Sequence, residues 1–131
     1  HPEVTYEITI DETIPKVEID APQMNRAIVN LLENATTAVL EGGNSQKKVS
    51  IRTSYDADVH IATLDISDTG PGIPPKVKER LFEPYFSTKR GGTGLGLVIV
   101  NRIVSDHNGF IRVRDNTPTG TSFNIELPVK E

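Results

Sequence analysis

The chain has 131 residues, a length that suits one domain with a sizeable hydrophobic core and is too short for two. Its formal net charge is −4, and its lysines and arginines occur singly or in pairs, so we expect no nucleic-acid partner. It has no cysteine and no apolar stretch long enough to cross a bilayer, which excludes a disulfide framework and a membrane span and suits a reducing, cytoplasmic location.

The N-terminal part predicts two antiparallel strands followed by a long helix. Residues 4–11 alternate apolar and polar side chains, and residues 16–20 form a shorter run of the same kind. The helix is expected from about Pro22 to Leu40, with Asp20 as its N-cap and Gly42-Gly43 as its stop. Because the first residue is not Met, we expect residues 1–131 to be one domain of a longer protein.

The rest of the chain predicts a hairpin, two more helices and a second pair of strands. The expected ranges are strands 47–55 and 59–67, helices 75–81 and 94–107, and strands 110–114 and 121–129. The segment between the two helices shows neither period and is typical of a loop. We therefore expect an α+β two-layer sandwich, a mixed and mostly antiparallel sheet of about five or six strands with three helices on one face.

The segment Asp68-Thr69-Gly70-Pro71-Gly72-Ile73 follows an apolar strand and is the first candidate for a ligand site. Asp68 continues the apolar face of that strand, so its carboxylate is expected to point inward, where it needs a partner. The 6-amino group of adenine is a suitable donor, whereas guanine has an oxygen at that position. Gly70 and Gly72 allow the backbone to approach a flat ring. Taken alone, the segment is equally typical of a tight turn after an edge strand.

The long helix carries two carboxamides, Asn30 and Asn34, one turn apart on the face opposite its apolar stripe. The stripe consists of Ile28, Leu31, Leu32, Ala35 and Val39. Neutral amide oxygens can bind Mg²⁺ without repelling a triphosphate, although solvated surface is the better explanation of the two residues when they are taken alone. Glu33 on the same helix is a rival ligand or base, although a solvated surface acid is the more usual role for such a residue.

A glycine-rich segment, residues 91–97, leads from the loop into the next helix, where free N–H groups attract phosphate. It matches neither the Walker loop nor the dinucleotide fingerprint. Lys89 and Arg90 precede it and could meet phosphate oxygens, or could be ordinary solvated charges. Phe82 and Phe86 could pin the loop to the body of the domain. His60 and His107 have no metal-ligand spacing and are expected to be structural or surface residues.

Five segments in this order resemble the catalytic, ATP-binding domain of bacterial sensor histidine kinases, which share the Bergerat fold with gyrase, Hsp90 and MutL. They are Asn30–Ala35 (NLLENA), Asp68–Ile73 (DTGPGI), Leu81–Lys89 (LFEPYFSTK), Gly91–Leu97 (GGTGLGL) and Thr119–Phe123 (TGTSF). The resemblance covers nearly the whole chain, and five ordered segments are far more specific than any one of them. The loop and the Asn108-Gly109 turn look closest to nitrogen-regulation-type kinases.

The resemblance implies a role for each matching residue. It assigns Asn30 and Lys89 to the catalytic step, Asn34 and Asn30 to Mg²⁺, and the segment 83–92 to a lid over ATP. The residues that it implies for ATP binding are Asn30, Asn34, Asp68, Gly70, Gly72, Ile73, Phe82, Lys89, Arg90, Gly92, Thr93, Gly94, Leu95, Gly96, Leu97 and Thr121. Many members carry Lys where this chain has Thr37, which leaves open what replaces that charge.

The resemblance also implies partners. Its members transfer the γ-phosphoryl group of ATP to a histidine on a separate dimerisation domain, and a response regulator acts downstream. No acceptor helix precedes residue 4, so this chain is expected to be a monomeric ATP-binding half. The alternatives are a nucleotide-sensing module, an ATP-hydrolysing relative and a serine kinase on the same fold. Asn30 disfavours hydrolysis, because the hydrolysing relatives use a Glu there to activate water.

Overall fold

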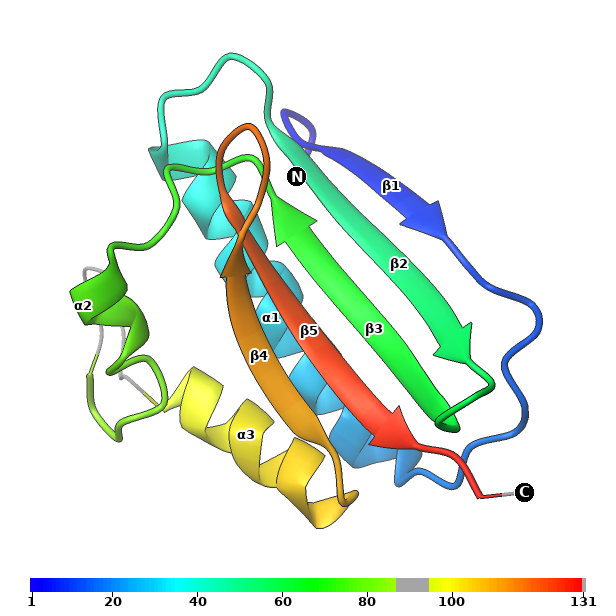
Figure 1. The fold of residues 1–131 in the computed structure, drawn as a ribbon. Helices are drawn as coiled ribbons and strands as arrows, with labels where there is room; N and C mark the ends of the chain where they lie inside the picture. Colours follow the sequence, from blue (N-terminus) through cyan, green and yellow to red (C-terminus); the bar gives the residue numbers. More distant parts are fainter. Residues whose placement is uncertain (87–94, 131) are drawn as a thin grey trace.

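The computed structural model describes residues 1–86 and 95–130, which form a sheet backed by helices (Figure 1). Its elements are β1 (Thr5–Thr9), α1 (Ala21–Glu41), β2 (Lys48–Asp56), β3 (Ile61–Asp68), α2 (Pro75–Lys78), α3 (Gly96–Asp106), β4 (Phe110–Asp115) and β5 (Thr121–Pro128). The five strands lie in the order β1-β2-β3-β5-β4. Strand β1 runs parallel to β2, and the other neighbours are antiparallel. The expected α+β class with a mixed, mostly antiparallel sheet and three helices is confirmed within the described residues.

The expected pairing of the N-terminal strands is wrong. Residues 16–20 form no strand, and β1 pairs in parallel with β2, with Thr5 opposite Lys48 and Thr9 opposite Arg52. Parallel neighbours require a long crossover, and α1 supplies it by returning the chain along the back of the sheet. The segment before α1 is therefore the approach to the helix. Two helix ends also differ from expectation, because α2 ends at Lys78 and α3 at Asp106.

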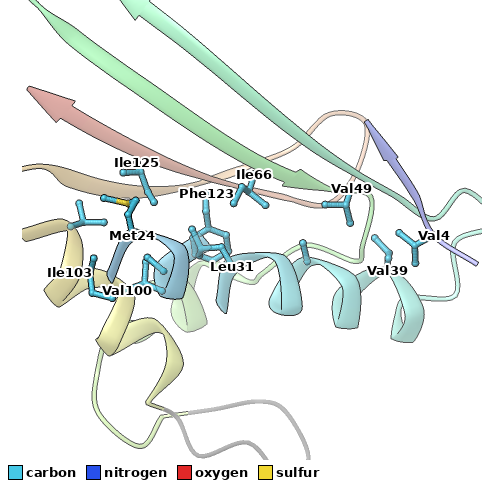
Figure 2. Packing of buried hydrophobic residues seen from close by; sticks show 13 residues of the cluster. Val4, Met24, Leu31, Val39, Val49, Ile66, Val100, Ile103, Phe123 and Ile125 are labelled. Atoms are coloured by element: carbon cyan, nitrogen blue, oxygen red, sulfur yellow. The ribbon is translucent and has the colours of Figure 1, made fainter. Parts of the chain in front are cut away.

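Helix α1 begins where its sequence predicts, and the expected stripe is buried at Leu31, Ala35 and Val39. The other buried positions are Met24 and Ala27, whereas the expected Ile28 and Leu32 are only partly buried. The Asp20 side chain accepts a hydrogen bond from the Gln23 N–H at 3.2 Å, which caps the helix. One stripe of the helix is buried against the sheet and α3, as Figure 2 shows for Met24, Leu31 and Val39. Strand residues Val49, Ile66, Phe123 and Ile125 meet this stripe, with Val100 and Ile103 from α3. The core therefore lies between the sheet and these two helices.

The opposite face of the sheet is polar. It carries a hollow of about 820 Å³ lined by charged and polar side chains of all five strands, such as Glu7, Asp65 and Asn124. Across β3 and β5, Ser67 donates to Ser122 at 2.8 Å and Asn124 donates to Asp65 at 2.5 Å. The described part of the chain thus has two layers, with one sheet face left open. Within that part, no helix combines the length and hydropathy that crossing a bilayer requires.

His107 ties the two large helices together at the end away from the Asp68 loop. Its Nδ1 donates to the Ile103 carbonyl at 2.7 Å, and its Nε2 accepts from the backbone N–H of Asp20 at 2.9 Å. Both ring nitrogens are therefore used by the neutral imidazole, which joins the C-terminal end of α3 to the N-cap of α1. The expected structural role of His107 is confirmed.

Replacing the His107 side chain tests how much its two hydrogen bonds contribute to stability. We expect His107→Ala to lower the free energy of unfolding by about 1–2 kcal/mol, because two hydrogen bonds are lost. His107→Gln keeps an amide oxygen that can accept from the Asp20 N–H and should lose less. Urea denaturation of the three proteins measures the difference, and equal midpoints for all three would show that the tie contributes nothing.

Candidate functional site

Asp68, the last residue of β3, is a buried carboxylate with one oxygen satisfied by the backbone. The residue is 3% exposed, and its Oδ1 accepts from the N–H groups of Gly70 at 2.9 Å and Thr121 at 3.2 Å. No described residue donates to Oδ2. Among the described residues, the fully buried side-chain atom without a hydrogen-bond partner is Asn124 Oδ1, so Oδ2 of Asp68 retains some exposure. Burial raises the pKa of Asp68, and the two backbone hydrogen bonds oppose that rise. Asp68 therefore offers an inward-facing acceptor to a ligand.

The loop after Asp68 is anchored on both sides. The buried Thr69 hydroxyl donates to the Gln46 carbonyl at 2.7 Å and accepts from the Lys48 N–H at 3.0 Å, which ties the loop to the start of β2. From the other side, the Thr119 hydroxyl donates to the Gly70 carbonyl at 2.9 Å. Asn44 adds a hydrogen bond to the Thr69 carbonyl at 3.2 Å. The loop is therefore held in place without any ligand.

Two expected glycines of this loop are required by its geometry. A Cβ on Gly70 would lie 3.0 Å from the Ala38 Cβ and 3.0 Å from Asp68 Oδ1, so a side chain would crowd the carboxylate. Gly72 has a φ of +82°, which favours glycine. The contact between Gly70 and Ala38 also shows that the last turns of α1 pack directly under the loop.

This contact aligns the two carboxamides of α1 with Asp68. Asn30, Asn34 and Ala38 follow one another at intervals of four residues, so they share one face of the helix, and Ala38 touches the loop. Both asparagines are half-buried rather than fully solvated. Among the described residues there is no cluster of three or more His, Cys, Asp or Glu that could hold a metal. The polar oxygens on this helix face fit Mg²⁺, which accepts few protein oxygens when phosphates supply the rest.

The third side of the site is only partly described. Leu95 is the N-cap of α3, Gly96 and Leu97 open the helix, and Leu97 packs against the core together with Ile73 and Phe82. Phe86 lies 4.3 Å from the Arg80 guanidinium, measured to the ring centre. The expected site residues Lys89, Arg90, Gly92, Thr93 and Gly94 lie outside the described residues.

The turn between β4 and β5 contributes Asn116 and Gly120, which were not among the expected site residues. Gly120 has a φ of +106°, and a Cβ there would lie 1.9 Å from the Asp68 carbonyl oxygen. The Asn116 side chain donates to the same oxygen at 2.8 Å. Thr121, which was expected at the site, is 4% exposed and adjoins this turn. In the sequence, Gly120 was the one signal of this contact. The contact itself was not predictable from local pattern, because Gly120 and Asp68 are far apart in the chain.

Comparison of the sequence with known proteins finds an ATPase family and sensor histidine kinases. Residues 19–131 match a family described as histidine kinase-, DNA gyrase B- and HSP90-like ATPases. The chain is 35% identical to the sensory histidine kinase/phosphatase NtrB of Vibrio alginolyticus, over 96% of this chain and 37% of that protein. It is 33% identical to the sensor histidine kinase ZraS of Salmonella typhimurium, over 97% of this chain and 26% of that protein. The chain thus spans about a third of the length of these relatives.

Two solved structures resemble the fold closely. The nucleotide-free catalytic domain of the histidine kinase ThkA superposes with a TM-score of 0.82 at 30% identity, covering 97% of this chain and 80% of that one. The mycobacterial sensor histidine kinase MprB gives a TM-score of 0.80 at 35% identity, covering 98% of this chain and 84% of that one. Both similarities cover almost the whole of this chain.

Proposed function

The chain belongs to the family of histidine kinase-, DNA gyrase B- and HSP90-like ATPases as a sensor histidine kinase catalytic domain, and from this premise we propose that it binds Mg-ATP and transfers the γ-phosphoryl group to a histidine. The acceptor would lie on a dimerisation domain of the same parent protein, and a response regulator would receive the phosphoryl group next. We place this work in the cytoplasm, with the isolated domain as a monomer.

One observation carries the proposal, namely the buried Asp68 with its Oδ2 left to a ligand. Two backbone N–H groups hold Oδ1, so the carboxylate has a defined direction. An acceptor of this kind suits the 6-amino group of adenine and opposes the oxygen of guanine. The proposal therefore predicts that the site distinguishes the two purines by one hydrogen bond.

The face of α1 that leads to the loop supports the second half of the proposal. Asn34 and Asn30 would hold Mg²⁺, which when bound neutralises the charge of the phosphates. Asn30 has no basic group that could take a proton from water, so this chain would position a protein acceptor rather than activate water. Gly96 and Leu97 open α3 with N–H groups that would face the phosphates, and Lys89 and Arg90 would add positive charge.

The proposal is tested by mixing the chain with a helical-hairpin domain that carries the acceptor histidine and with radiolabelled ATP. We expect acid-labile phosphohistidine on the hairpin and no sustained release of ADP by the chain alone. Tight ATP binding with no transfer would instead favour a nucleotide-sensing module. Sustained ADP release would contradict the role proposed for Asn30.

Asn34 provides a prediction about the metal. Asn34→Ala is expected to weaken Mg-ATP binding about three- to tenfold while leaving ATP affinity in EDTA unchanged, because only the metal-dependent part is lost. Calorimetry with and without Mg²⁺ measures both quantities. Asn25→Ala is the matched control, since Asn25 lies on the same helix and is exposed. Equal loss in EDTA would mean that Asn34 contributes to the fold or to the nucleotide rather than to Mg²⁺.

A further inference from the structure

The pairing between β3 and β5 ends in an unusual exchange of hydrogen bonds at Asp68. The ladder runs regularly from Ile61 opposite Pro128 to Ser67 opposite Ser122. The backbone groups of successive strand residues point alternately to the two neighbouring strands. The N–H of Thr69, the residue after Asp68, donates to the Lys48 carbonyl of β2. The backbone of Asp68 therefore faces β5, where one more step of the ladder would bring the Thr121 N–H to the Asp68 carbonyl.

That backbone bond is replaced by two bonds that involve side chains. The Thr121 N–H donates to the carboxylate Oδ1 of Asp68 at 3.2 Å. The Asp68 carbonyl instead receives the side-chain amide of Asn116 at 2.8 Å. A buried carbonyl without a donor is costly, so if Asn116 were absent the carbonyl would compete for the Thr121 N–H. The amide of Asn116 thus leaves that N–H available to the carboxylate.

Asn116 is itself held in the geometry that this role needs. Its backbone N–H donates to the Gly120 carbonyl at 3.0 Å, and its Oδ1 accepts from the Thr117 N–H at 3.0 Å. The turn is pressed against Asp68, because Gly120 leaves no room for a Cβ beside the Asp68 carbonyl. The side chain therefore reaches Asp68 from a closed turn rather than from a free loop.

We infer that Asn116 is a positioning residue for nucleotide recognition, which directs the Asp68 carboxylate by occupying its backbone carbonyl. The inference rests on the proposed function, in which Oδ2 accepts from the adenine amino group. The Thr121 N–H also opposes the rise in the pKa of Asp68, so its loss would leave the carboxylate less ionised as well as less well oriented. Asn116 itself need not touch the nucleotide.

The test compares two ligands, Mg-ATP and the Mg complex of a purine nucleoside triphosphate with hydrogen in place of the 6-amino group. By calorimetry, the unaltered chain should prefer ATP by about tenfold or more, and Asn116→Ala should reduce that preference by about fivefold. Asn116→Asp keeps the shape and the acceptor for the Thr117 N–H but removes the donor, and it should reduce the preference to a similar extent. Asn44→Ala is the matched control. It removes the same kind of hydrogen bond, from a side-chain amide to the neighbouring Thr69 carbonyl, but leaves the bond to the Asp68 carbonyl in place, so the preference for ATP should be unchanged.

The ligand comparison separates positioning from a general effect on folding. A structural role alone would weaken both nucleotides equally, and that result would overturn the inference. If the unaltered chain shows no preference for the amino purine, the proposed function fails as well. A preference in the unaltered chain that survives in both Asn116 variants would overturn only the inference. Circular dichroism melts of each variant establish that the compared proteins are folded.

Discussion

Asp68→Asn is expected to weaken ATP binding by about ten- to a hundredfold, because a hydrogen bond to a charged acceptor is replaced by a clash of donors. An asparagine can keep its oxygen toward the N–H groups of Gly70 and Thr121, which hold Oδ1 in the unaltered chain. Its amide would then face the adenine amino group. Isothermal calorimetry with Mg-ATP measures the loss, and unchanged affinity would remove Asp68 from the site.

The same substitution should not destabilise the ligand-free domain at neutral pH. Burial raises the pKa of Asp68 above its ordinary value of 3.8, so the folded chain binds this proton more readily than the unfolded chain does. The resulting stabilisation is fully present below about pH 3.8 and is lost as the pH rises through the raised pKa. At a pH above the raised pKa this stabilisation is absent, so at neutral pH we expect Asp68→Asn to melt at the same temperature as the unaltered chain or higher.

Asp65→Asn is the matched control for both measurements. Asp65 lies on the same strand but on its opposite face, where it accepts from Asn124 and lines the polar hollow. Its replacement should leave ATP affinity unchanged. If both variants lost ATP binding equally, the effect would come from the strand and not from the Asp68 carboxylate. A strong loss of stability in Asp68→Asn at neutral pH would contradict the direction of the pKa shift.

Gly120→Ala should have the largest effect on the fold around the site. The new Cβ would lie 1.9 Å from the carbonyl oxygen of Asp68 and 2.7 Å from its carbonyl carbon, on a backbone with φ of +106°. Strain and overlap together should lower the free energy of unfolding by about 3–5 kcal/mol. Because the turn must move away from Asp68, ATP affinity in the folded fraction should also fall.

Gly43→Ala separates the two causes. Gly43 also has a positive φ, +70°, but a Cβ there meets no atom within 4 Å. This variant should cost about 1 kcal/mol from backbone strain alone and leave ATP binding intact. Urea denaturation and calorimetry measure both variants. Similar costs for the two would mean that the close approach of Gly120 to Asp68 does not contribute.

Periodicity and turn chemistry in the sequence predicted most elements and the direction in which Asp68 points. A period of two distinguishes the faces of β3, and a helical period distinguishes the buried side of α1, so local pattern alone places Asp68 and the buried positions Leu31, Ala35 and Val39. The hairpin of β2 and β3 and the cap at Asp20 are likewise properties of neighbouring residues. These predictions are confirmed because each depends on contacts within one element or one turn.

The sequence by itself determined most of the elements, their faces and the ordered motifs that identify the family, although the strand expected at residues 16–20 does not form. Only the tertiary structure decided the partner of β1 and the group of residues around Asp68. Thr121 and Asn116 lie 53 and 48 residues from Asp68 in the chain, and no local pattern encodes which N–H reaches its carboxylate and which side chain takes its carbonyl. Such pairings follow from the packing of the whole sheet, since a strand carries the same alternation whichever neighbour it joins.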